Sequence, residues 1–370
     1  MRFKQFQDNW SSKRLSDIAE VVGGGTPDTT DSTLWNGGIQ WFTPTEVGHS
    51  KYVSMSARTI SQLGLQKSSA KILPAGSILL SSRATVGECS ITQKDCTTNQ
   101  GFQNLIPKKG INNEFLYYLA QTQKRHFIKY ASGSTFLEIS NSEIKKTKCA
   151  VPSIEEQTEI ATFLSAIDRK IEVQNKIISK YETLIKGIRE RVVSGSWQWK
   201  KLDELIQEGV VRLNRGNIIP KHQKDNTYKY PVYSSSTQNN GLMGYNNTYM
   251  FDKELITWSI DGGGNFFYRK KHKFNVTNVC GIMQVDENVY SYRFIAEMLT
   301  YQHSKMKFDY QSKAHPSVIS SLYSLPCLPV LEQNSYCQLF VALDRKMQIE
   351  QYGLNKLKEQ KKYLFSKMFI

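Results

Sequence analysis

The side chains that stand out by type and spacing in this sequence are basic and hydroxyl groups. They are suited to binding a polyanion through charge and hydrogen bonds rather than to catalysis. The densest basic run is residues 269–273 (RKKHK), and lysines and arginines in such a run neutralise phosphates without distinguishing sequence. Arg83 and Thr85 follow a strand predicted within Lys71–Ser81, where an arginine can pair with a guanine or with a phosphate. We predict nucleic-acid contacts at both places, with an ordinary solvated loop as the alternative for each.

Two glycine-rich segments could bring the backbone close to a ligand. Residues 23–27 (GGGTP) lack the G-x-G-x-x-G spacing of a cofactor loop, so we predict a turn beside the nucleic acid. Residues 261–265 (DGGGN) allow close approach either to the nucleic acid or to a neighbouring loop. Residues 132–135 (SGST) and 312–315 (SKAH) occupy similar places before a helix-opening proline, and they suit groove contacts or ordinary turns. The residues that we predict to contact DNA are Thr26, Lys67, Arg83, Thr85, Ser134, Asn265, Arg269, Lys270, Lys271 and Lys313.

Motifs for catalysis and for metal binding are missing from the sequence. There is no Pro-Pro pair, which the polar-Pro-Pro-aromatic loop of adenine methylation needs, and no G-x-x-x-x-G-K-[ST] loop for ATP. Pro27-Asp28 is far from the Glu143-Ile144-Lys145 segment, which argues against a nuclease. The six cysteines include no CxxC pair, and the six histidines have no metal-ligand spacing. We therefore predict no catalytic site, no cofactor and no metal in this chain.

The formal net charge is +15 and the isoelectric point is about 9.3. The excess is spread along the chain, which favours a basic surface on folded domains with an anionic partner. A membrane is a poor candidate, because no apolar run approaches the roughly 20 residues that span a bilayer and residues 1–10 do not resemble a signal peptide. We expect a cytoplasmic protein whose 370 residues are enough for two domains.

An internal repeat supplies the elements that must position these side chains. Residues 151–170 (VPSIEEQTEIATFLSAIDRK) match residues 328–346 (LPVLEQNSYCQLFVALDRK), and each contains a proline, a Glu-Gln pair and an Ala-Ile/Leu-Asp-Arg-Lys box. With one gap, the offset is 176 residues. A weaker echo joins the segment from Trp10 to Ile18 with the segment from Trp199 to Leu205. The predicted layout is domain, helix, domain, helix.

Both repeated segments carry apolar residues in a 4-3 spacing, which is typical of a coiled-coil seam. The first seam is Ile160, Leu164, Ile167, Ile171, Gln174, Ile178, Tyr181, Ile185, Ile188 and Val192. The second is Tyr336, Phe340, Leu343, Met347, Glu350, Leu354, Leu357, Lys361, Leu364 and Met368. Gln174 and Glu350 are equivalent polar positions, which lower stability but fix the register. Each helix is expected to run about 40 residues, or about 60 Å at 1.5 Å per residue.

If the two helices pair with each other, the connectivity makes them antiparallel. We predict an α+β protein with two globular mixed α/β domains, separated by two long antiparallel helices that form a coiled-coil spacer with approximate two-fold symmetry. The predicted parts are residues 1–150, 151–195, 196–327 and 328–370. Within the domains we predict strands in Lys71–Ser81 and Leu255–Ile260, and amphipathic helices over Phe115–Tyr130 and Tyr292–Met306. The alternative is two unrelated helices, each packed on its own domain.

In these motifs the chain resembles the specificity subunit of type I restriction–modification enzymes over nearly its whole length. The resemblance rests on the Glu-Gln opening and the Asp-Arg-Lys box of each helix. It also rests on residues 24–27 with 35–41 (GGTP…WNGGIQW), 74–80 (PAGSILL) and 98–102 (TNQGF). It implies that the domains are target-recognition domains, each reading one half of a split, asymmetric DNA site. The second domain departs from the GGTP…W pattern, which fits two different half-sites.

The resemblance also implies partners. The helices would set the gap between the half-sites on double-stranded DNA and dock two methyltransferase subunits, and restriction subunits with motor and nuclease activity can then join. S-adenosylmethionine is expected in the methyltransferase partner, and ATP and Mg in the restriction partner. The predicted partner-binding residues are the charges beside the seam, Asp168, Arg169, Lys170, Asp344, Arg345 and Lys346. Their recurrence favours two like partners, and a solvated helix face is the alternative.

Two other functions stay open from the sequence. A self-contained DNA-modifying enzyme, such as a compact methyltransferase, would bind S-adenosylmethionine by itself. A basic coiled-coil scaffold for another anion would bind DNA without salt dependence or not at all, whereas phosphate contacts make log affinity fall with log salt.

Overall fold

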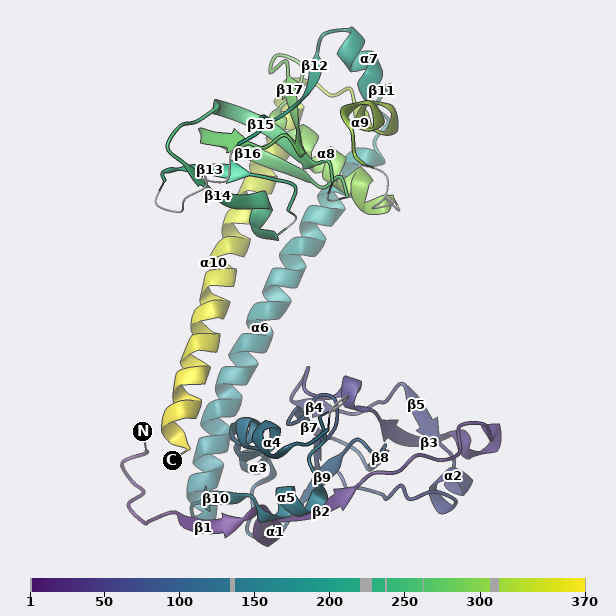
Figure 1. The fold of residues 1–370 in the computed structure, drawn as a ribbon, viewed down its shortest axis with the longest axis vertical. Coiled ribbons are helices and arrows are strands. Elements are labelled where there is room, and N and C mark those ends of the chain that lie inside the picture. The colour runs from purple at the N-terminus through teal and green to yellow at the C-terminus, as the bar shows by residue number, and fades with distance from the viewer. Residues whose placement is uncertain are drawn as a thin grey trace. The chain divides into compact units, whose positions relative to one another are not determined.

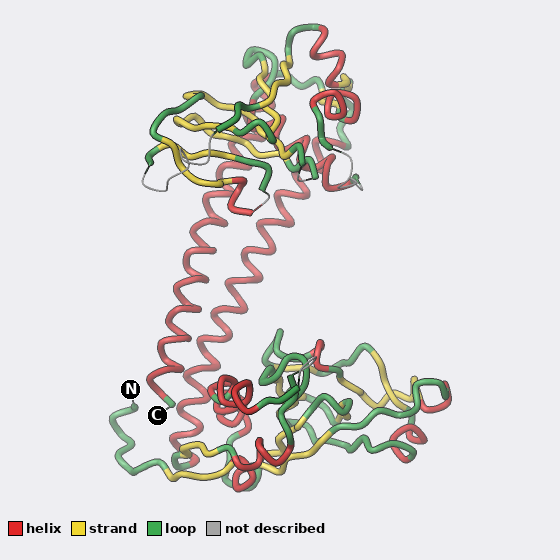
Figure 2. Tube along the Cα trace, in the orientation of Figure 1, coloured by secondary structure: helices red, strands yellow, loops and turns green. Residues whose placement is uncertain are grey.

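The structure is a computed structural model of the chain, and it describes residues 2–133, 137–219, 228–236, 238–261, 263–306 and 313–369. Figures 1 and 2 show its helices and strands. The chain forms two compact units, one of Met1–Val173 with Gly353–Ile370 and one of Gln174–Tyr352. Each unit therefore combines a globular part with one end of each of two long helices.

The first unit is closed by a short frame. Strand β1 (Ser11–Arg14) pairs antiparallel with β10 (Lys148–Val151), and helix α1 (Leu15–Ile18) follows β1 directly. The Leu15 N–H donates to the Thr147 carbonyl at 2.9 Å, and the Leu15 side chain is fully buried. The frame brings the two ends of the globular part together where the first long helix begins.

The first unit contains two further sheets, of five and three strands. The five-stranded sheet has the order β2-β9-β6-β7-β4, in which the β4–β7 pair is parallel and the other pairs are antiparallel. In the three-stranded sheet, β3 pairs antiparallel with β5 and parallel with β8. The strands and the two short helices beside them are β2 (Ala19–Gly23), β3 (Trp35–Phe42), β4 (Tyr52–Val53), β5 (Arg58–Ile60), α2 (Gln62–Gln66), β6 (Ile78–Leu80), β7 (Cys89–Thr92), β8 (Cys96–Thr98), β9 (Gln103–Pro107) and α5 (Asn141–Lys146). The strand predicted within Lys71–Ser81 is β6.

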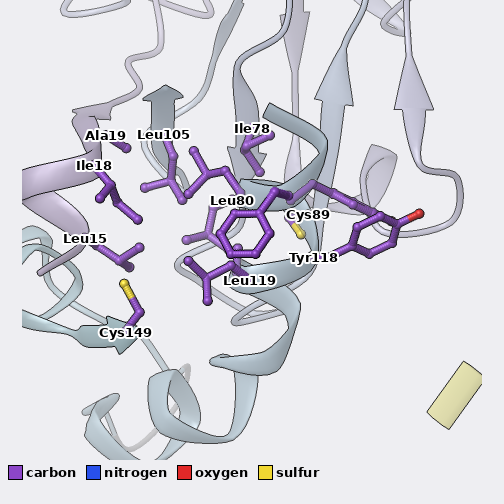
Figure 3. Packing of buried hydrophobic residues seen from close by; sticks show 14 of the residues in the cluster. Leu15, Ile18, Ala19, Ile78, Leu80, Cys89, Leu105, Tyr118, Leu119 and Cys149 are labelled. Atoms are coloured by element: carbon purple, nitrogen blue, oxygen red, sulfur yellow. The ribbon is translucent and has the colours of Figure 1, made fainter. Parts of the chain in front are cut away.

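Helix α3 (Asn113–Thr122) closes the core of this unit over the five-stranded sheet. Figure 3 labels the buried side chains Leu15, Ile18, Ala19, Ile78, Leu80, Cys89, Leu105, Tyr118, Leu119 and Cys149 of this core. Ile160 and Leu164 of the first long helix and Leu364 of the second belong to the same cluster. Burying apolar surface stabilises the folded state by about 25 cal/mol for each Å² removed from water. The burial of these helix residues in the core therefore holds one end of each long helix against the domain.

The single helix predicted over Phe115–Tyr130 is two helices, α3 and α4 (Lys124–Tyr130). They meet at Gln123, whose N–H is shared between two carbonyls, one of them that of Leu119. The Thr122 hydroxyl donates to the same carbonyl at 2.7 Å and competes with the helical ladder. The prediction was wrong at this break because hydrophobic spacing does not show where a threonine takes a backbone acceptor.

The second unit repeats the frame. Strand β11 (Trp199–Lys201) pairs antiparallel with β18 (Ser324–Pro326), and helix α7 (Leu202–Gln207) follows β11. The Leu202 N–H donates to the Tyr323 carbonyl at 3.0 Å. The echo between the two Trp-containing segments of the sequence is therefore confirmed as a repeated strand, helix and closing hydrogen bond.

A six-stranded sheet in the order β12-β17-β15-β16-β13-β14 fills the second unit. Helix α8 lies against β15 and β16. It is the helix predicted over Tyr292–Met306 and ends one residue earlier. The elements are β12 (Val211–Arg215), β13 (Tyr230–Tyr233), β14 (Leu242–Asn246), β15 (Phe251–Ser259), β16 (Phe266–Val276), β17 (Cys280–Val285), α8 (Tyr292–Lys305) and α9 (Pro316–Leu322). The strand predicted at Leu255–Ile260 is the second half of β15.

The main sheets of the two units share one topology. The order β2-β9-β6-β7-β4 corresponds strand for strand to β12-β17-β15-β16-β13, and the last pair is parallel in both. The three-stranded sheet of β3, β5 and β8 has no counterpart in the described part of the second unit. The two units therefore have the same framework and differ in what is built on it.

The long helices are α6 (Ile154–Val193) and α10 (Val330–Met368), of 40 and 39 residues. Every predicted seam residue on them is buried or half-buried. The first unit holds the start of α6 and the end of α10 in one core, and the second holds the end of α6 and the start of α10. The helices pair antiparallel, as predicted. Within the described residues, neither these nor the shorter helices are long and apolar enough to cross a membrane.

A buried glutamine fixes the start of α6. The Gln157 side chain is fully buried, and its Nε2 donates to the carbonyls of Pro152 at 3.0 Å and Gly110 at 3.4 Å. Its Oε1 accepts the Asn112 N–H at 3.0 Å. One side chain thus satisfies main-chain groups both before α6 and before α3.

Gln333 does the same for α10. Its Nε2 donates to the carbonyls of Leu328 at 2.8 Å and Val289 at 2.9 Å, and its Oε1 accepts the Ser291 N–H at 2.9 Å. The glutamine of the repeated Glu-Gln pair therefore attaches each long helix to the loop before α3 or α8.

We expect Gln157→Ala and Gln333→Ala each to lower the free energy of unfolding by about 2–3 kcal/mol, because each leaves buried main-chain groups unpaired. Gln338→Ala is the matched control, since Gln338 is exposed on α10 and its loss should change stability by less than about 0.5 kcal/mol. Urea denaturation followed by circular dichroism measures the difference. Equal effects of the three substitutions would contradict this account.

Candidate nucleic-acid and partner interfaces

Thr26 and Thr85 lie in loops of the first unit that are connected through Gln100, Gly101 and Pro44. The Thr26 hydroxyl donates to the side-chain oxygen of Gln100, and the Thr85 hydroxyl contacts the Pro44 carbonyl at 3.4 Å. Gly101, next to Gln100, leaves no room for a Cβ atom because the Pro44 ring lies 2.9 Å from that position. A series of contacts therefore links the loops of two predicted contact residues that are far apart in sequence, and both carry hydroxyls suited to bases or phosphates.

Two tryptophans hold the Gly-Gly-Thr-Pro loop in place. The Trp41 Nε1–H donates to the Gly25 carbonyl at 2.9 Å, and the Trp35 Nε1–H donates to the Asp28 carbonyl at 2.9 Å. A Cβ at Gly25 would lie 2.3 Å from the Ala70 nitrogen, so only glycine fits there. The spacing GGTP…W…W is therefore the signature of a loop fixed by indole donors, and Thr26 is positioned by it.

Arg83 and Lys67 lie on the surface of the same unit. Both are exposed, and the Arg83 Nε lies 3.8 Å from the Glu138 carboxylate. Ala84 follows with a φ of 63°, a left-handed conformation that residues other than glycine rarely adopt. Backbone strain of this kind in a surface loop supports the hypothesis that the loop is functional. Ser134, the remaining predicted contact of this unit, lies outside the described residues.

In the second unit, Asn265 and Lys313 flank the turn that joins β15 to β16. The Asn265 carbonyl accepts the Ser259 N–H at 3.2 Å, and the Lys313 ammonium lies 3.5 Å from the Asp261 carboxylate. The Ala314 N–H donates to the Ile260 carbonyl at 2.9 Å, so the segment before α9 is fastened to this turn. The turn thus occupies the place that the Arg83 loop has after β6.

The basic run of β16 divides into buried and exposed parts. Lys270 and Lys271 are exposed where the register between β15 and β16 shifts. Arg269 is only 4% exposed, its guanidinium lies 3.7 Å from the centre of the Tyr233 ring, and its Nε donates to the Thr257 hydroxyl at 2.9 Å. Burial lowers the pKa of Arg269 to about 10. Lys270 and Lys271 are presented to solvent, whereas Arg269 lies inside the domain.

Sequence reasoning missed Arg58, the first residue of β5. Its guanidinium lies 3.6 Å from the centre of the Trp35 ring and 5.6 Å from that of Trp41, and the side chain is exposed. The available signal was the pair of tryptophans in the GGTP…W…W segment, since a fixed aromatic surface attracts an arginine. Nothing in the spacing of Arg58 itself indicated that it would lie there.

The repeated Asp-Arg-Lys boxes divide into an inward and an outward part. The Asp168 carboxylate accepts the Tyr118 hydroxyl at 2.7 Å and pairs with Lys361 of α10 at 2.6 Å. Asp344 pairs with Arg293 of α8 at 2.6 Å. Both aspartates therefore attach a long helix to its own domain, which is a physical role different from the partner contact predicted for them.

The rest of each box is presented to solvent. The exposed members are Arg169, Lys170, Arg345 and Lys346. Apolar side chains lie beside them at equivalent positions of α6 and α10: Phe163 and Leu339 are 39% and 51% exposed, and Val173 and Ile349 are 54% and 62% exposed. Phe163 and Val173 lie at the same offset of 176 residues from Leu339 and Ile349. Each helix thus carries the same mixed apolar and basic face away from the seam.

A polar network beside Asp168 joins α6 to α3 through Ser165 and Glu114. The Lys51 ammonium donates to the Glu114 carboxylate at 2.9 Å and to the Ser165 hydroxyl at 2.6 Å. Burial lowers the pKa of Lys51. Burial alone would raise the pKa of Glu114, but the donors Ser165, Tyr52 and Lys51 outweigh it and hold that pKa below its usual range. The charged pair is therefore a fixed part of the helix attachment.

The profile of one family, the type I restriction modification DNA specificity domain, matches the chain twice, over residues 7–183 and 195–359. The chain belongs to this family. The Type I restriction enzyme MjaIX specificity subunit of Methanocaldococcus jannaschii is 41% identical over 179 residues, which cover 46% of this chain and 41% of that protein. The EcoR124I/EcoR124II specificity subunit of Escherichia coli is 27% identical over 203 residues, covering 50% of each chain.

These alignments span about half the length of the curated relatives. The fold is supported separately by a solved structure, the crystal structure of a type I restriction-modification S subunit from M. genitalium. It superposes with a TM-score of 0.68 at 17% identity and covers 100% of this chain and 99% of that one. The two matched segments correspond to two specificity domains, each with one of the two main sheets.

We expect Asp168→Ala to lower the free energy of unfolding by about 2–3 kcal/mol, because Lys361 and the Tyr118 hydroxyl both lose a partly buried partner. Arg169→Ala, one residue away on the exposed face, is the control and should change stability by less than about 0.5 kcal/mol. Thermal denaturation of the full chain compares them. A larger effect at Arg169 than at Asp168 would show that the inward role is assigned to the wrong residue.

Proposed function

We propose that this chain is the DNA specificity subunit of a type I restriction–modification enzyme and that it acts in the cytoplasm without a catalytic site of its own. Each globular domain, residues 1–150 and 196–327, reads one half of a split DNA site. The observation that carries the proposal is one framework used twice with different surfaces, since the first unit has a three-stranded sheet that the described residues of the second unit do not form. Different base sequences need different side chains at the base edges, whereas the framework can be common.

The contacts with double-stranded DNA divide by chemistry. Lys67, Lys270, Lys271 and Lys313 neutralise phosphates, which gives affinity without specificity. Thr26, Arg83, Thr85 and Asn265 lie at loops or turns and supply hydrogen bonds to base edges or to the backbone. Ser134 is proposed with them from the sequence alone. Arg269 acts from inside the domain, by shaping β16 beside the two exposed lysines.

Two methyltransferase subunits dock on the long helices, residues 151–195 and 328–370. The support is the repeated outward face, in which Lys170 with Val173 and Lys346 with Ile349 present the same apolar and basic chemistry twice. Two equal surfaces on one chain suit two copies of one partner. The partner supplies S-adenosylmethionine, and restriction subunits that join the complex supply ATP and Mg. The length of the helices sets the gap between the half-sites.

The test is to purify the chain with the methyltransferase encoded beside it and to map N6-methyladenine on plasmid DNA by single-molecule sequencing. A single asymmetric motif of two half-sites with a fixed gap supports the proposal. S-adenosylmethionine binding by the isolated chain would favour a self-contained enzyme instead. Methylation without a split motif, or DNA binding that does not depend on salt, would favour the basic scaffold.

The double substitution Lys270→Gln with Lys271→Gln should weaken binding to all duplexes and reduce the slope of log affinity against log salt by about 2, one for each lost phosphate contact. The methylated motif should stay the same. Lys358→Gln with Lys362→Gln is the control, because it removes two exposed lysines from α10. Fluorescence anisotropy at several salt concentrations measures both slopes, and a changed motif would assign the β16 lysines to bases instead.

Val173→Asp and Ile349→Asp should each remove one methyltransferase copy from the complex, and the double variant should remove both. Each substitution places a carboxylate in the apolar part of the proposed docking surface, where burying a charge is costly. Ser179→Asp, exposed on another face of α6, should leave the stoichiometry unchanged. Native mass spectrometry counts the subunits. Two bound copies in the double variant would place docking elsewhere.

A further inference from the structure

We propose that Arg58 reads a guanine in the half-site bound by the first domain, as a specificity-determining residue. This inference rests on the proposed function, because it names a residue that selects the sequence. The residue lies at the start of β5, in the three-stranded sheet.

The guanidinium of Arg58 is held by a rigid aromatic surface. Its carbon lies 3.6 Å from the centre of the Trp35 ring. Trp35 and Trp41 are buried, with their rings 5.0 Å apart and nearly perpendicular. Each indole is fixed in turn by its hydrogen bond to the main chain at Asp28 or Gly25. Stacking of this kind orders an arginine side chain before any ligand arrives, so little conformational entropy remains to be lost on binding.

The donors of this ordered guanidinium are available. Among the residues that the structure describes, none accepts a hydrogen bond from the Arg58 guanidinium or forms an ion pair with it. Arg2, by contrast, is bonded through Nε and Nη2 to the Glu156 carboxylate, and Arg83 lies beside Glu138. An exposed arginine that is ordered by stacking and has all five N–H donors unused is arranged for an acceptor from outside the chain.

Two acceptors match the planar fork of an arginine on DNA, the O6 and N7 atoms of guanine and a pair of phosphate oxygens. The place of Arg58 decides between them. Phosphate contacts are common to every sequence, whereas base contacts must differ between domains that read different half-sites. Arg58 lies in the sheet that the first unit has and the described part of the second lacks. It is also joined through Trp41 and Gly25 to the loop of Thr26. The geometry therefore points to a base.

The experiment uses the full chain with its methyltransferase partner and compares the methylated motifs of wild type, Arg58→Gln, Arg58→Lys and the control Arg125→Lys. Arg125 is an exposed arginine of the same unit, on α4. The wild type should require a G·C pair at one position of one half-site, by about 10- to 100-fold over other pairs. Arg58→Gln should accept any pair at that position and leave the other half-site unchanged, and Arg125→Lys should match the wild type.

The outcomes separate this inference from the function that it rests on. If the wild type gives a split motif and Arg58→Gln gives the same motif, with or without uniformly weaker binding, Arg58 is a phosphate contact or a surface residue and the inference fails alone. If the wild type gives no split motif, the proposed function fails and this inference with it. If Arg58→Gln melts at a much lower temperature, Arg58→Lys decides, because it keeps the charge without the fork. A degenerate position then supports the inference, and an unchanged motif overturns it.

Discussion

Each long helix is attached to its domain through a buried glutamine whose amide bonds only to main-chain groups, and leaving those groups unpaired costs about 1–3 kcal/mol for each one. Gln157 and Gln333 make this attachment at equivalent places. The first turn of α6 or α10 is therefore fixed against the loop that precedes α3 or α8. The positions of the seam, of the Asp-Arg-Lys box and of the outward face then follow from helical geometry, since every later residue on the helix has a fixed angle and height.

Polar pairs between α6 and α10 fix the register of the two helices, which pair through their apolar seam. Gln174 donates to the main chain of Glu350 at 3.0 Å, so the equivalent polar positions of the two helices bind each other in the second unit. Asp168 and Lys361 pair at 2.6 Å in the first. Burying such groups stabilises a helix pair less than leucine would, but each pair is satisfied only at one register. The polar interruptions of the seam thus select an alignment that the apolar residues alone would not distinguish from a shift by one heptad.

The sequence was most informative where a pattern has a single physical cause. The 4-3 spacing of Ile160, Leu164 and Ile167 follows from the need to bury one helix face, and the structure has those residues buried. The role of Asp168 could not be derived, because an off-seam carboxylate and a solvated one look alike until Tyr118 and Lys361 are placed around it. The burial of Arg269 was missed for a similar reason. Within a run of basic residues, the sequence does not show which side chain points inward. Arg269 packs on Tyr233 inside the domain, whereas the two lysines that follow it are exposed.

The frame strands that close each domain have a consequence for how such a chain can change. β1 with β10 and β11 with β18 are joined by main-chain hydrogen bonds, and the bonds from Leu15 to Thr147 and from Leu202 to Tyr323 are also main chain to main chain. Bonds of this kind do not depend on which side chains the intervening residues carry. The segment inside the frame is in that sense an interchangeable insert, and the added β3–β5–β8 sheet of the first unit is an example of such a variation. Recombination between genes at the frame strands would exchange one insert for another while the frame stayed intact, provided that the new insert brings its own loop for Gln157 or Gln333 to bond.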